Sequence, residues 1–255
     1  VGPADAVETF RGAATNTVEL DGRTLLPGFI DAHLHLVSYA KSFVTADLSP
    51  SKNVDSISDI QSVIKNISRN RPSGQWIFGR GYNEFYLAEK RHPNRWDLDQ
   101  VVPDHPVRLT HRSGHAHVLN SIALKLVGIT RETGEPEGGM IERDLKTGEP
   151  TGLLYEMGDF LVDRIPPLDP AALEKGLQLA NQELISLGVT SIQDASSRND
   201  TEQWELLKSW KESAILHPRV NLMVGMYAFK KNNTQYHLNG LNQNQLRLGA
   251  VKIIL

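Results

Sequence analysis

The feature that most constrains the fold is a regular alternation of helix and strand patterns in the second part of the chain. After Pro166-Pro167 the expected elements are, in order, a helix from Pro170 with Asp169 as its N-cap, a strand at 189–194, a helix at 201–214, and strands at 219–225 and 248–255. Strands that alternate with helices along a chain are typical of β/α units, in which the strands run parallel. The sequence therefore predicts an α/β fold built on a parallel sheet.

The first part of the chain supplies one more strand of this kind, followed by a long intervening segment. Residues 25–31 are expected to form a turn and a short buried strand that ends near His35, and residues 53–69 place apolar residues at helical spacing. A hairpin is expected at 139–155. With the later strands this gives four, half of an eight-stranded barrel, so we expect the N-terminal half of a (β/α)8 TIM-like barrel with a large insertion after strand 1.

We expect the chain to be divided into three parts. Residues 1–24 resemble part of a small β-sandwich, and residues 25–255 supply barrel strands 1–4, with 70–165 as an inserted capping region. The chain starts without Met and ends on Val-Lys-Ile-Ile-Leu, so we expect it to be the N-terminal portion of a longer protein.

Charge and composition narrow the class of protein. The chain has 255 residues and a net charge of −3, with 27 Lys and Arg against 30 Asp and Glu. This balance gives no reason to expect a nucleic acid or an anionic membrane as a partner. The lack of cysteine excludes disulfides and thiolate metal ligands. No apolar run is long enough to span a bilayer, and residues 1–10 lack the features of a signal peptide, so we expect a cytoplasmic location.

The strongest local motif is His33-Leu34-His35 at the end of the first strand. Residues i and i+2 of a strand point to the same face, so both imidazoles can converge on one ion. They stand at the end of a barrel strand, where barrel enzymes place their active sites. Imidazole suits zinc and its first-row neighbours. The alternative is a chance pair of histidines that are exposed or hydrogen-bonded.

Lys252 is the second residue that points to chemistry, because it lies in the almost wholly apolar strand 250–255. Lysine is rarely buried unless it is paired. Its amine could be neutralised as a Schiff base or as a carbamate that binds a metal. It could equally be a lysine at a strand end that extends into solvent. The strand alone leaves these possibilities open.

Several motifs resemble a known family. Residues 26–35, Leu-Pro-Gly-Phe-Ile-Asp-Ala-His-Leu-His, resemble the first-strand motif of the amidohydrolase superfamily. Further segments resemble its amidohydrolase-3 or YtcJ-like branch, which includes N-substituted formamide deformylase. These segments are Trp76-Ile77 with Gly79-x-Gly81, Gly114-His115-Ala116, Gly138-Gly139, Pro150-Thr151-Gly152 and Gly188-Val189-Thr190-Ser191. The matches follow in order along the whole chain.

The resemblance implies a metal-dependent hydrolase with a distorted (β/α)8 barrel beside a small β-sandwich. His33 and His35 would bind the first metal, and Lys252 matches a fourth-strand lysine that in many members is carboxylated and bridges two metals. His115 would contact substrate. The cofactor would be one or two divalent ions, with zinc expected. Metal-activated hydroxide would attack an amide-type C–N bond of a small-molecule substrate, an N-substituted amide or formamide.

The sequence also departs from the family pattern. The pattern continues with histidines after strands five and six and an aspartate after strand eight that acts as general base, and we expect these beyond Leu255. The branch commonly has a tryptophan-aspartate pair where this chain has Tyr82-Asn83. We therefore expect the 255-residue chain alone to be inactive. The alternative is a catalytically incomplete amidohydrolase-like fragment with a binding or regulatory role, whose open edge strand would favour a homo-oligomer or another partner.

The other polar candidates are weighed one by one. We interpret His111 as structural, and a second metal site at His117 is the weaker interpretation of that residue. Asp194, which ends a strand, could face the pocket or cap the next segment, and the cap is favoured. Glu156 could face the pocket or begin a helix. Solvated roles are expected for His92, His105, His217 and His237.

Overall fold

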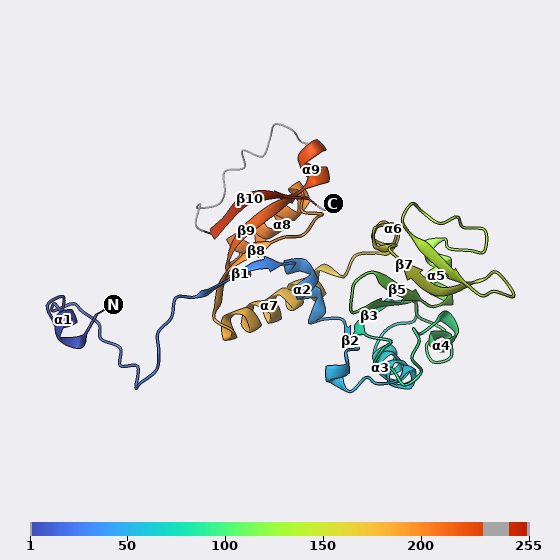
Figure 1. The fold of residues 1–255 in the computed structure, drawn as a ribbon, viewed down its shortest axis with the longest axis horizontal. Helices are drawn as coiled ribbons and strands as arrows, with labels where there is room; N and C mark the ends of the chain where they lie inside the picture. The colour runs from blue at the N-terminus through green and yellow to red at the C-terminus, as the bar shows by residue number, and fades with distance from the viewer. Residues whose placement is uncertain (1, 232–244, 254–255) are drawn as a thin grey trace.

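The computed structural model describes residues 2–231 and 245–253, and these form two sheets with helices packed on them (Figure 1). The first sheet has four strands in the order β1-β8-β9-β10. The second has six strands in the order β2-β3-β4-β5-β7-β6. None of the described helices is both long and apolar enough to cross a membrane.

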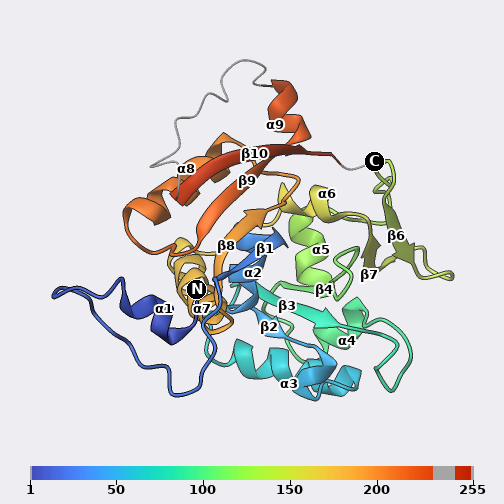
Figure 2. The same ribbon diagram turned by 60° about the vertical axis from the view of Figure 1, so that its left-hand side comes forward.

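The first sheet is wholly parallel, and its strands lie side by side in chain order (Figure 2). It consists of β1 (Phe29–Leu34), β8 (Val189–Asp194), β9 (Arg219–Gly225) and β10 (Leu246–Lys252). Its helices are α2 (Leu36–Ser42), α7 (Pro170–Ser186), α8 (Thr201–Glu212) and α9 (Met226–Lys231). The predicted parallel β/α pattern is therefore confirmed. The half-barrel itself stays a prediction.

One face of this sheet is apolar and the other is polar. Ile192, Val220 and Leu222 are buried in a core with residues of α2, α7 and α8. The opposite face carries polar side chains, of which Asn221 donates to Gln193 at 2.7 Å. This alternation follows from the two-residue period of a strand, and it places α2, α7 and α8 on the apolar face.

Helix α7 begins where the sequence predicts, with Asp169 as N-cap and Pro170 first, although the Asp169 side chain makes no capping hydrogen bond. Its buried face includes Leu177, Ala180 and Leu184. Leu187 is 56% exposed, because it lies beyond the last residue of the helix as the C-cap.

The contact between α2 and α7 depends on Gly176. A Cβ atom at this position would lie 2.3 Å from the carbonyl oxygen of Ala40. Only glycine lets the two helix backbones approach this closely. The contact matters for the site because α2 starts directly after His35.

The second sheet is mixed, and helices cover both of its faces. Its strands are β2 (Ala46–Asp47), β3 (Ile77–Tyr82), β4 (Val107–His111), β5 (Ala116–Leu119), β6 (Met140–Arg143) and β7 (Pro150–Tyr155). Val118 packs in one core with helix α3 (Ile57–Ser68), whereas the next residue, Leu119, packs in another with helix α5 (Ser121–Val127). The remaining short elements are a 3-10 turn (Pro50–Lys52), α4 (Arg95–Asp99) and α6 (Gly158–Val162).

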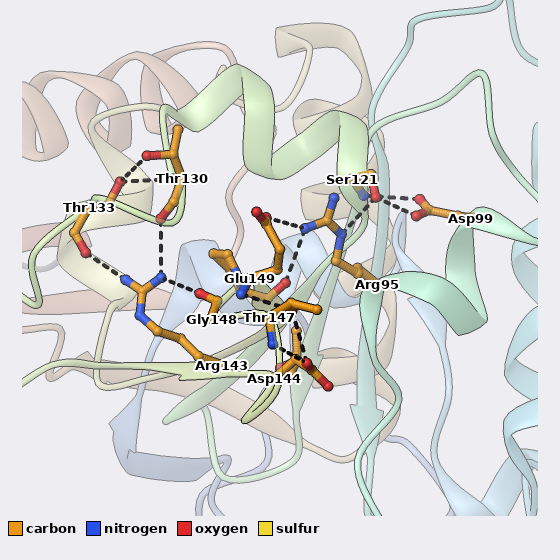
Figure 3. Close-up of polar contacts among 12 residues, drawn as sticks. Arg95, Asp99, Ser121, Thr130, Thr133, Arg143, Asp144, Thr147, Gly148 and Glu149 are labelled. Carbon is orange, nitrogen blue, oxygen red and sulfur yellow. Dashed lines mark hydrogen bonds and ion pairs between the residues drawn. The ribbon is translucent and has the colours of Figure 1, made fainter.

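The predicted hairpin is present as β6 and β7, which pair antiparallel. Asp144 accepts hydrogen bonds from the backbone of Lys146 and Thr147 in its turn, and Arg143 donates to the carbonyls of Thr133 and Gly148 (Figure 3). Arg143 and Asp144 thus have a structural role in closing the turn.

Two observations relate to the expected division of the chain, which stays a prediction. Strand β2 and helix α3, which precede residue 70, belong to the second sheet and its core. Within residues 2–24 the structure shows one short helix, α1 (Ala4–Glu8), and no strand. This segment leads away from the first sheet (Figure 1). Its membership of a β-sandwich stays a prediction.

Candidate functional site

The two histidines of the motif lie at the carboxyl edge of the parallel sheet. β1 ends at Leu34, and His35 is the N-cap of α2. The rings of His33 and His35 have centroids 5.3 Å apart and are nearly perpendicular, at 87°. Both side chains are exposed and line the same cavity. The structure therefore brings this predicted pair together.

The loop after β8 orients His35. Its Nδ1 lies 3.2 Å from the hydroxyl oxygen of Ser196, and the Ser196 amide donates to the Asp194 carboxylate at 2.9 Å. One ring nitrogen of His35 is thereby engaged, which leaves Nε2 for a ligand. A metal-binding histidine is commonly held in this way through its other nitrogen.

Asp194 is buried, with 1% of its surface exposed, and it joins the segment that follows His35 to the loop after β8. Its carboxylate accepts hydrogen bonds from the amide of Leu36 at 3.1 Å, the amide of Ser196 at 2.9 Å and the side chain of Asn199 at 3.1 Å. It therefore caps the start of α2 as well as the turn after β8. The favoured interpretation of Asp194 as a cap is confirmed.

A cavity of about 810 Å³ lies between the carboxyl edge of the first sheet and the second sheet. Its volume is in the range of small-molecule sites. Its walls come from the end of β1 and α2, from β3 and β4, and from the segment before α7. Apolar lining is provided by Leu34, Tyr39, Phe78, Val162, Ile165 and Leu168.

The polar part of the cavity lining is cationic. It includes Lys41, Arg80, Arg108 and Arg112, and no Asp or Glu of the described residues is among the lining side chains. Burial lowers the pKa of Arg108 to about 10, so its guanidinium stays protonated at neutral pH. Partial burial and the charge of Arg108 also lower the pKa of Lys41, although this lysine keeps an exposed surface. Arg108 was not predicted as a site residue, although in the sequence it stands between the apolar residues Val107 and Leu109 of an expected strand.

Lys252 also lies at the carboxyl edge, as the last residue of β10. However, β10 and β1 are the two outer strands of the sheet, three strand spacings or roughly 14 Å apart in a flat sheet. Lys252 is not among the residues that line the cavity. No group of three or more His, Asp or Glu side chains within the described ranges is placed to hold a metal ion. The role of Lys252 as a ligand stays a prediction.

The strand that carries Lys252 is less buried than expected. Leu246 is buried, but the other residues of β10 are exposed or partly exposed, because β10 is an edge strand of the described sheet. Ile253, just after the strand, is 55% exposed. Residues 254–255 lie outside the described residues.

His115 is not among the residues that line the cavity, although the preceding residue, Gly114, is. Its side chain is 67% exposed, and its Nδ1 is 3.0 Å from the carboxylate of Glu156. Glu156, with a φ of 53°, begins no helix and does not line the cavity. The role of His115 in substrate binding stays a prediction.

His117 is 3% exposed, and burial and the charge of Arg108 lower its pKa to about 3. It is therefore neutral. Its Nδ1 accepts from the Thr110 hydroxyl at 3.3 Å and is 3.4 Å from Arg108 Nη2. This neighbouring cation disfavours the second metal site at His117.

The solvated roles predicted for two histidines are wrong. His92 is half-buried, with its Nδ1 2.9 Å from the Tyr82 hydroxyl, and His105 is buried against the Gln75 carbonyl. His111 contacts Glu84 and Ser113, as a structural residue would. His217 is exposed as expected, and His237 lies outside the described residues.

Comparison with known proteins identifies the family. The model of the amidohydrolase family Amidohydro_3 matches residues 16–255. The chain belongs to this family. The amidohydrolase resemblance is thus confirmed, and two relatives support the YtcJ-like branch. The putative amidohydrolase YtcJ of Bacillus subtilis is 35% identical over 72% of this chain and 34% of its own length. The N-substituted formamide deformylase of Arthrobacter pascens is 37% identical over 72% of this chain and 35% of its own length.

A solved structure supports the fold. An uncharacterized metal-dependent hydrolase from Pyrococcus horikoshii superposes with a TM-score of 0.65 at 23% identity, over 97% of this chain and 46% of the other. The amidohydrolase chain described here spans about a third of the length of the two relatives that it matches.

Proposed function

We propose that this amidohydrolase is a metal-dependent hydrolase that cleaves an amide-type C–N bond of a small molecule. The observation that carries the proposal is the pair His33 and His35, side by side at the carboxyl edge of a parallel sheet and open to a cavity of about 810 Å³. Family membership supports the hydrolase class. The choice of N-substituted amides or formamides is supported by the name of one relative.

The residues present fit a divalent metal. Two imidazoles that lie side by side at the end of β1 suit zinc, and the contact of His35 with Ser196 leaves its other nitrogen for the ion. We propose His33 and His35 as ligands, with Lys252 as a further ligand and one or two ions. A bound ion would supply an acidified water and polarise the scissile carbonyl.

The chain's own residues prepare this site. Asp194 and Ser196 hold the His35 ring, and Asp31 accepts from the His33 amide at 3.0 Å. Apolar side chains such as Tyr39 and Phe78 exclude water from part of the cavity. We keep His115 as a proposed substrate contact for the part of a substrate that extends beyond the cavity.

The test uses protein expressed from its own gene. Zinc and manganese content would be measured by mass spectrometry, and amine release from N-substituted formamides and acetamides would be followed. His33→Ala and His35→Ala are expected to lose metal and turnover together. His217→Ala, which removes an exposed histidine away from the cavity, is the matched control. Unchanged metal content and activity in His33→Ala would contradict the proposal.

The alternative, a binding or regulatory protein that keeps the family scaffold, is favoured by one observation. His33 and His35 are two imidazoles, and within the described residues no group of three or more His, Asp or Glu side chains is placed to hold a metal ion. This alternative predicts no turnover of any amide by the metal-loaded natural protein, even with His33 and His35 intact.

A further inference from the structure

The cavity beside His33 and His35 carries charge of one sign. Lys41, Arg80, Arg108 and Arg112 line it. In the part of the chain that the structure describes, none of these four cations forms an ion pair. A cleft lined by cations attracts anions and raises their local concentration.

Arg108 is the most buried of these cations. Its Nε is buried without a hydrogen-bond partner, and its Nη2 has only the Nδ1 of His117, at 3.4 Å. Its Nη1 has no hydrogen-bond partner among the described residues and is not among the buried unpartnered atoms. A buried charge without a counter-ion is unfavourable unless a ligand compensates it. Nη1 is thus available to a ligand in the cavity that Arg108 lines.

The neighbours of Arg108 hold it in place without neutralising it. His117 is neutral and accepts from Thr110 through the same Nδ1 that faces the guanidinium. Lys41, from the end of α2, adds a second positive charge on the cavity side. None of the neighbouring side chains His117, Thr110 and Lys41 is an anion, so Arg108 and Lys41 keep their positive charges for a ligand.

We propose that Arg108, with Lys41 beside it, binds a carboxylate of the substrate. A guanidinium presents a planar set of donors that matches a carboxylate. The substrate class is then an amide that also carries a carboxylate and fits a cavity of about 810 Å³. The assignment of the amide rests on the proposed function, whereas binding of the anion does not.

The test measures binding to metal-stripped protein, so it does not depend on turnover. Succinamate, which has an amide and a carboxylate, would be titrated by calorimetry against succinamide, its neutral analogue of similar size. Wild-type protein is expected to bind succinamate about tenfold more tightly or better, as for a hydrogen bond to a charged group. Equal affinity for the two compounds would overturn the proposal.

Variants locate the binding group. Arg108→Met is expected to lower succinamate affinity to that of succinamide, and Lys41→Met to lower it less. Arg23→Met removes one charge from a residue 79% exposed outside the cavity and should leave affinity unchanged. Circular dichroism checks folding. If Arg108→Met does not fold, Arg108→Lys takes its place. This variant keeps the charge but loses the planar set of donors of the guanidinium, so it must weaken succinamate binding several-fold. Wild-type affinity in whichever of these Arg108 variants folds would overturn the proposal.

Two further arms separate the possible outcomes. Inorganic phosphate that binds as tightly as succinamate would overturn the assignment of a carboxylate. His33→Ala should keep the preference for succinamate in metal-stripped protein. If the wild-type protein prefers succinamate but has no amide hydrolase activity, the result counts against the proposed function alone. If it has the activity but does not prefer succinamate, the result counts against the carboxylate subsite alone.

Discussion

Replacement of Asp194 by alanine tests how the fold holds the metal-binding pair. The carboxylate accepts from Leu36, Ser196 and Asn199, and it is 1% exposed. Asn199 keeps a second acceptor, the Met223 carbonyl at 2.9 Å, whereas the two backbone amides lose theirs. A buried donor left without a partner costs about 1–3 kcal/mol. Asp194→Ala should therefore destabilise the protein by roughly 2–5 kcal/mol.

The assay is urea unfolding followed by circular dichroism, with hydrogen exchange at the Leu36 amide as a local measurement. Asp200→Ala is the control, because Asp200 caps α8 through one hydrogen bond, to the Gln203 amide at 2.9 Å. Loss of such a cap costs about 1 kcal/mol. If Asp194→Ala costs no more than Asp200→Ala, and Leu36 stays protected from exchange, the role assigned to Asp194 is wrong.

Three further predictions concern packing and charge. Gly176→Ala should lower the free energy of unfolding by about 1–2 kcal/mol, because overpacking against Ala40 outweighs the gain in helix propensity. Gly134→Ala is the control and should not lower it, because a Cβ atom at Gly134 has open space around it. Equal stability of the two variants in urea would contradict the close contact between α2 and α7. The pKa of His117 falls from 6.5 to about 3 on folding, so stability should be full above pH 6.5 and decrease as pH falls toward 3. His117→Gln should reduce this slope in acid titrations, and an unchanged slope would count against a buried neutral His117. Arg108→Met should leave the melting temperature of anion-free protein unchanged or raised, because an unpaired buried charge is removed; a clear decrease would contradict the unpaired state.

Local patterns in the sequence predicted much of the first sheet. Apolar spacing and Asp169-Pro170 gave the start of α7, and strands 189–194 and 219–225 have the predicted bounds. These features depend on residues close in sequence. The proximity of His33 and His35 could be predicted for the same reason, because they are two residues apart, although His35 lies just beyond the end of β1.

The second sheet and the cavity could not be predicted in the same way. Strand β5 pairs with β7, more than thirty residues later, and such non-local pairing has no local pattern. Arg108 gains its significance from elements distant in sequence, because α2 and β1 bring Lys41 and His33 to the same cavity. His92 and His105 lie in loop-like sequence, yet tertiary contacts with Tyr82 and Gln75 bury them.

The most direct test of a metal centre at His33 and His35 is zinc titration of the metal-stripped protein, with wild type and the His33→Ala, His35→Ala and His217→Ala variants compared by calorimetry. Loss of either cavity histidine is expected to weaken zinc binding by about tenfold or more, since each removes one of two adjacent imidazoles. His217→Ala should bind zinc as wild type does. Equal zinc affinity in all four proteins would contradict a metal centre at His33 and His35.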